Sequence, residues 1–161
     1  MASTGIAKTS SAMRRFVLLP ITLFRVQPRL PVSLRDYDTQ MANGRTSYVL
    51  KTYNSIVRPM PADSPFHTPN GMSLRPSGEK MAAILREFRG DPQVYRMQEG
   101  TFLPSGLVVF HEHSDHYSLQ VSEEMSLSDF NARLTDYLKS LPRVSRDAWL
   151  AAYDDVDDQD N

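Results

Sequence analysis

Two neighbouring segments near the middle of the chain carry the clearest pattern of hydrophobic and polar positions. Residues 107–110 are an apolar run, and further on Tyr117, Leu119 and Val121 alternate with polar residues. Alternation with a period of two is typical of a half-buried strand. We therefore expect an antiparallel hairpin, with Ser114 and Asp115 as its two-residue turn. Three of the four histidines of the chain lie beside this turn.

The turn sets the register of the hairpin. The expected opposite pairs are His113 with His116, Glu112 with Tyr117, His111 with Ser118 and Phe110 with Leu119. Because side chains alternate between faces, one face is polar and consists of His111, His113, His116, Ser118 and Gln120. The other face is apolar and consists of Val108, Phe110, Tyr117, Leu119 and Val121. In this register Glu112 lies on the face away from the histidines.

Helical periodicity predicts helices at 77–89, 126–141 and 145–153. In the second of these, Ser126 and Asp129 form a capping box, and the third packs through Trp149. A shorter helix is expected to begin at Ser33 as its cap and to end at Ala42. Further strands are expected at Ile21–Val26, Ser47–Val57, Met72–Leu74 and Gln93–Gln98. We find no internal repeat, and the elements together predict a single α+β domain.

The composition of the chain excludes several kinds of functional site. The chain has 161 residues and no cysteine, which excludes disulfides, thiolate zinc sites and cysteine nucleophiles and fits a reducing compartment. The first 35 residues are basic and the last eight acidic, so we expect a disordered leader over 1–19, a folded domain over 20–153 and an acidic tail over 154–161. A cytoplasmic location is expected, with a mitochondrial presequence as the alternative. No segment is long enough to span a membrane.

The histidines have several interpretations. A zinc ion bound by His111, His113 and His116 suits neutral imidazoles. Catalysis by a serine nucleophile would draw on Ser73 or on a serine of the hairpin, but no G-x-S-x-G motif is present. Alternatively, the histidines are only the polar face of a hairpin that another element covers.

The order of several segments indicates a family. A first strand that contains Arg25 (ITLFRV), a segment with Ser73 (GMSLRP), the strand LPSGLVV and then HYSL with a following helix together resemble the ADP-ribosyltransferase-like toxins. Within them the chain looks most like the Tse-type effector toxins exported by type VI secretion and their eukaryotic relatives. The resemblance covers residues 22–141. It implies a split β-sheet with flanking helices, whose cleft holds NAD as the substrate from which ADP-ribose passes to an unknown protein or nucleic-acid acceptor.

The resemblance also implies roles for four residues. Arg25 would bind a phosphate or ribose of NAD, a role suited to a forked, permanently charged donor. Ser73 is similar to the serine that lines the nicotinamide ribose, and His116 matches a histidine of the cleft with a catalytic and an NAD-binding role. His113, the second catalytic candidate, stands where the toxin relatives carry an amide.

Transferases of this fold use a glutamate to stabilise the oxocarbenium-like state, and no E-x-E motif ends the strand in this sequence. This leaves two alternatives to the enzyme: a catalytically inactive partner-binding module on the same fold, and the three-histidine zinc site.

Overall fold

A computed structural model of the chain describes residues 12–44, 50–61, 63–66 and 69–159. Its elements in chain order are β1 (Arg14–Phe16), β2 (Leu23–Gln27), α1 (Tyr37–Ala42), β3 (Ile56–Val57), β4 (Met72–Leu74), α2 (Glu79–Glu87), β5 (Gln93–Met97), β6 (Leu107–His113), β7 (His116–Val121), β8 (Met125–Ser126), α3 (Leu127–Lys139), β9 (Arg143–Ser145) and α4 (Arg146–Gln159). Helices and antiparallel strands are mixed along the chain, which confirms the α+β class.

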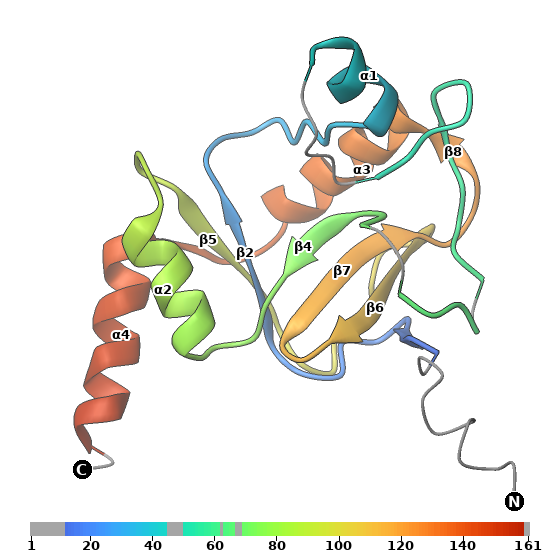
Figure 1. Cartoon of the computed structure of the whole chain (residues 1–161). Helices are drawn as coiled ribbons and strands as arrows, with labels where there is room; N and C mark the ends of the chain where they lie inside the picture. Colours follow the sequence, from blue (N-terminus) through green and yellow to red (C-terminus); the bar gives the residue numbers. More distant parts are fainter. Residues whose placement is uncertain (1–11, 45–49, 62, 67–68, 160–161) are drawn as a thin grey trace, which may run out of the picture.

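The main sheet is split into two parts that meet at one point. One part has the strand order β1-β6-β7-β4 and the other β2-β5-β9, with a small β3-β8 pair beside them. The two parts are joined where Phe24 of β2 bridges to Arg75, just after β4, and the backbone N–H of each residue donates to the carbonyl oxygen of the other, at 2.8 and 3.1 Å. Figure 1 shows β2 crossing close to the end of β4. This is the split sheet that the resemblance implied.

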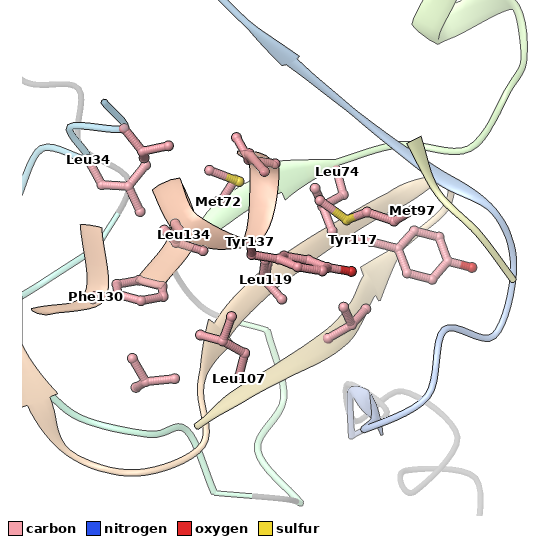
Figure 2. Close-up of a cluster of buried hydrophobic side chains, with 14 of the residues drawn as sticks. Leu34, Met72, Leu74, Met97, Leu107, Tyr117, Leu119, Phe130, Leu134 and Tyr137 are labelled. Carbon is pink, nitrogen blue, oxygen red and sulfur yellow. The ribbon is translucent and has the colours of Figure 1, made fainter. Parts of the chain in front are cut away.

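Helix α3 covers one face of the four-stranded part of the sheet. Its residues Phe130 and Leu134 are fully buried against Met72 of β4 and Leu119 of β7, as Figure 2 shows. The helix begins where expected, because the hydroxyl of Ser126 accepts a hydrogen bond from the backbone N–H of Asp129 at 3.0 Å. Truncating a fully buried Phe or Leu to alanine typically costs about 2–5 kcal/mol, so the packing of this helix on the strands contributes strongly to stability.

The three-stranded part is covered by α2 and α4, which lie side by side (Figure 1). The aromatic residue Trp149 of α4 is buried, and its ring meets the ring of Phe24 edge to face, with centroids 5.6 Å apart. Val94 and Leu85 complete this second cluster of buried side chains. The prediction that the last helix packs through Trp149 is confirmed. Within the described residues, no helix has the length and hydrophobicity needed to cross a membrane.

The ends of the domain differ from the prediction. Residues 14–16, expected in a disordered leader, form β1 and pair with β6, and Leu19 is fully buried. The first eleven residues of that predicted leader lie outside the described residues. At the other end, α4 continues to Gln159, into the predicted acidic tail. The leader was predicted from its composition, because charged and serine-rich segments are usually solvated. Composition gives no information about a short edge strand whose partner is distant in sequence.

Two local predictions were also wrong. The cap of α1 is Asp36, whose carboxylate accepts a hydrogen bond from the N–H of Thr39 at 2.8 Å, and Ser33 lies before the helix. The strand expected over residues 47–57 is present only as Ile56–Val57, after a turn in which Asn54 and Ser55 have positive φ. Residues 47–49 of that expected strand lie outside the described residues.

Candidate functional site

The histidine hairpin forms between β6 and β7, but a β-bulge changes its register. His113 pairs with His116 as expected, whereas the next pair is His111 with Tyr117, so Glu112 is the extra residue of the bulge. The pairs expected beyond it were therefore wrong by one position: Phe110 lies opposite Ser118, and Val109 lies opposite Leu119. A bulge places two residues of one strand opposite one residue of the other, which shifts every later side chain to the other face.

This shift exchanges the expected positions of His111 and Glu112. His111 lies on the face of Tyr117, with the two rings stacked at 4.3 Å, and its Nε2 atom is 2.7 Å from the carbonyl oxygen of Ser114. The carboxylate of Glu112 instead contacts the imidazole of His116 through Oε2 and Nδ1. The polar cluster therefore contains His113, His116 and Glu112, and it excludes His111. The three-histidine zinc site is wrong in this respect.

Ser73 connects the hairpin to the other part of the sheet. Its hydroxyl oxygen is 3.2 Å from Nε2 of His116, and its carbonyl oxygen accepts a hydrogen bond of 3.2 Å from Nη1 of Arg25. Ser73 is exposed between the buried residues Met72 and Leu74. Ring centroids of His113 and His116 are 5.4 Å apart. All four residues singled out by the resemblance therefore meet around β4, although they come from β2, β4, β6 and β7.

Arg25 lies at the place where the two parts of the sheet separate. It follows Phe24, which bridges to Arg75 just after β4, and its guanidinium group donates to Gln27 Oε1 at 3.0 Å as well as to Ser73. The residue is half-buried. Burial lowers the pKa of Arg25 to about 10, which still leaves the side chain charged at neutral pH. The cluster thus has a fixed positive charge beside Ser73.

A buried carboxyl group, that of Glu112, lies on the opposite side of His116 from Ser73. The side chain of Glu112 is 1% exposed, and that of His116 is 17% exposed. Glu112 Oε2 and His116 Nδ1 are buried and touch each other, yet neither has a hydrogen-bond partner among the described residues. The imidazole of His116 therefore lies between this carboxylate and the hydroxyl group of Ser73, which its Nε2 atom approaches at 3.2 Å.

Further contacts fix the hairpin against β4. Arg75, which follows β4, forms an ion pair of 2.8 Å with Asp115 in the turn. Ser114 of the same turn has a φ of 47°. Deeper along the same face, Gln120 accepts from the Nδ2 of Asn70 at 3.2 Å and donates to the hydroxyl of Ser118 at 2.8 Å. These contacts hold His116 in place above Ser73.

Glu112 is the residue of this cluster that sequence reasoning missed. The regular two-residue period placed it on the wrong face, and no glycine, proline or asparagine marks the bulge. The only available signal was chemical, because a glutamate between two histidines would otherwise be buried among apolar side chains without a partner.

A cavity of about 460 Å³ lies on the opposite face of β2 from Arg25. Its lining includes Phe24, Arg96, Arg143 and Trp149, and it contains none of the four residues singled out by the resemblance. Phe24 precedes Arg25 on the same strand, and consecutive side chains of a strand point to opposite faces. The cavity is therefore separate from the cluster around Ser73.

Comparison with known proteins gives one family. A family model described as the Tse2 ADP-ribosyltransferase toxin matches residues 21–149. The matched region contains Arg25, Ser73, Glu112, His113 and His116, and it covers most of the described chain. No curated protein and no solved structure matches the sequence.

Proposed function

The chain belongs to the Tse2 ADP-ribosyltransferase toxin family, and we propose that it cleaves NAD at the cluster around Ser73 and transfers ADP-ribose to an acceptor. The observation that carries the proposal is the convergence of Arg25 and His116 on Ser73, each at 3.2 Å, from strands that are far apart in sequence. Convergent polar groups with a buried charge are typical of an active site.

In the proposed reaction, the bond between the ribose carbon and the nicotinamide nitrogen breaks, and nicotinamide leaves as a neutral base. The acceptor forms a new bond to the same carbon and loses its proton to His116 or to solvent. Positive charge develops on the ribose as nicotinamide leaves, and a fixed negative charge stabilises this state. The buried carboxylate of Glu112, which contacts His116, supplies a negative charge beside the histidine in place of the missing E-x-E motif.

The other residues would bind and orient NAD. Arg25 carries a permanent charge next to Ser73, and a guanidinium group binds phosphate in a forked geometry. The exposed hydroxyl of Ser73 can accept or donate a hydrogen bond to a ribose hydroxyl. His113, which is exposed and stacks beside His116 next to the turn of the hairpin, can contact the nicotinamide side.

Release of nicotinamide from NAD by the purified protein tests this proposal. We expect His116→Ala to lower the rate by about 100-fold or more, which is the usual contribution of a positioned acid or base. His111→Ala is the matched control, because it removes the same side chain from the opposite face of the hairpin, and it should leave the rate unchanged. Arg25→Met should lower the apparent affinity for NAD by about tenfold or more. Arg143→Met, at the separate cavity, should leave this affinity unchanged.

The acceptor is addressed in the same assay with labelled NAD and cell lysate. Label that disappears on protease treatment indicates a protein acceptor, and label that disappears on nuclease treatment indicates a nucleic acid. If the protein releases no nicotinamide and NAD does not raise its melting temperature, the proposal that it is an enzyme acting on NAD is refuted.

One observation favours the inactive partner-binding module as the second candidate. Both contacts of the Arg25 guanidinium, to Ser73 and to Gln27, lie within the protein, and a group that joins the two parts of the sheet needs no ligand. In that case Arg25→Met lowers the melting temperature, and the wild-type protein releases no nicotinamide.

A further inference from the structure

The end of the β6–β7 hairpin brings three potential metal ligands together. One ligand atom from each of Glu112, His113 and His116 lies within 4.8 Å of the other two. Two come from β6, and the third comes from the first residue of β7 across the turn. The β-bulge at Glu112 makes the cluster, because it brings the carboxylate to the face that carries both imidazoles.

A second observation points to a ligand. Glu112 Oε2 and His116 Nδ1 are buried and in contact, but they make no hydrogen bond with each other or with any other group in the described part of the chain. A hydrogen bond requires the N–H to point at the oxygen. In this pair the two atoms are in contact as an ion pair and neither makes a hydrogen bond, so both remain available to a ligand. The Glu112 side chain is also 1% exposed, and a buried carboxylate is retained where a cation compensates it.

We propose that Glu112, His113 and His116 bind one divalent transition-metal ion. Two imidazoles and one carboxylate are a donor set that zinc accepts, with three protein ligands and a remaining position open to water. His113 is exposed, so its ring can turn toward the ion and also leaves a path of entry. The site differs from the three-histidine set expected from the sequence by one ligand, with Glu112 in place of His111.

His111 provides a strict control for this assignment. It is separated from His113 by one residue, yet its ring stacks on Tyr117 and its Nε2 atom contacts the carbonyl oxygen of Ser114. A site made by all three histidines of this segment would need His111, and the proposed site does not. The proposal shares these residues with the proposed NAD site, but its readout is metal binding, so one of the two can fail without the other.

The test is calorimetric titration of Zn²⁺ into full-length, tag-free protein that has been treated with a chelator. We expect one ion per chain, and affinity at least tenfold lower in each of Glu112→Gln, His113→Ala and His116→Ala. His111→Ala should bind zinc as the wild type does. Circular dichroism of each variant shows whether it is folded.

Substitution of Co²⁺ provides a second measurement that does not depend on stability. A four-coordinate cobalt site absorbs strongly in the visible range, and this band should form in the wild type and in His111→Ala but not in His113→Ala, where an exposed side chain is removed. The absence of saturable 1:1 binding would overturn the proposal. An equal loss of zinc affinity in His111→Ala and in Glu112→Gln would also overturn the proposal.

Discussion

Gly71 lies directly against the backbone of Leu119. A Cβ atom at Gly71 would be 2.3 Å from the carbonyl oxygen of Leu119, and this oxygen belongs to the backbone of β7 and cannot turn away. Only a hydrogen atom fits at this position. The close approach occurs next to the pairs of Met72 with Leu119 and Ser73 with Ser118, so it sets the distance between β4 and the strand that carries His116.

We expect Gly71→Ala to lower the free energy of unfolding by about 2–3 kcal/mol, because the added methyl group forces two paired strands apart. Gly78→Ala is the matched control, since nothing lies within 4 Å of its Cβ position, and it should cost at most about 1 kcal/mol through the weaker helix cap. Chemical denaturation of both variants measures the difference. Equal stability of the two would show that β4 can move away from β7 without cost.

The ion pair between Arg75 and Asp115 is the next contact that positions the hairpin. The side chains are 19% and 34% exposed and lie 2.8 Å apart. We expect Asp115→Asn to cost about 1–2 kcal/mol, because a half-buried arginine loses its charged partner. Glu124→Gln removes a more exposed partner, 3.7 Å from Arg58, and should cost less than about 0.5 kcal/mol. Denaturation at low and high salt tests both values, and a larger effect of Glu124→Gln would contradict the assignment.

Patterns with local causes were predictable from the sequence. The capping box of Ser126, the buried face of α3 and the pairing of His113 with His116 follow from neighbouring residues and were confirmed. The resemblance located Arg25 and Ser73, which lie 48 positions apart and meet only because β2 crosses the end of β4. The contact between these two residues depends on the tertiary arrangement, which the periodicity of hydrophobic residues in the sequence does not predict.

Features that depend on distant partners were not predictable. β1 is a three-residue edge strand that exists because β6 is available to pair with it, and its own sequence is too short and too charged to indicate a strand. The bulge at Glu112 has no sequence marker either. The strand that carries it is buried on both faces: Leu107 and Val109 lie in one cluster with Leu119, while Val108 and Phe110 lie in another, so the alternation of apolar and polar residues that would reveal the register is absent from β6.

Tyr137 should make stability depend on pH in alkaline solution. Burial raises the pKa of Tyr137 to about 12, from an ordinary value of 10.0. Between these values the unfolded chain loses the phenolic proton while the folded protein retains it. The folded state is therefore destabilised as the pH rises from 10 toward 12, and below pH 10 the residue makes no pH-dependent contribution.

The variant Tyr137→Phe has no proton to lose at this position and should lack this contribution. Two pKa units correspond to about 2.7 kcal/mol, and we expect about half of this because the residue keeps some contact with solvent. Urea denaturation of both proteins at the same series of pH values isolates the contribution, since all other groups, including Arg25, titrate alike in the two. Parallel pH profiles would show that the phenol titrates normally.

We expect that the bulge can be removed without changing the rest of the hairpin. His111 already pairs with Tyr117 and His113 with His116, so deletion of Glu112 joins two existing pairs into a regular ladder. We expect the deletion variant to fold with a free energy of unfolding within about 1 kcal/mol of the wild type, because it also removes a buried carboxylate that has no hydrogen bond. It should lose both zinc binding and nicotinamide release.

Deletion of Val109 is the control for this prediction. It shortens the same strand by one residue but shifts the side chains of β6 to the wrong faces, and a one-residue slip of a strand buried on its faces is strongly destabilising. We expect this variant to be unfolded by circular dichroism, while the Glu112 deletion gives the wild-type spectrum. If the Glu112 deletion also unfolds, the bulge is required for packing. If it folds and keeps both activities, Glu112 takes part in neither of them.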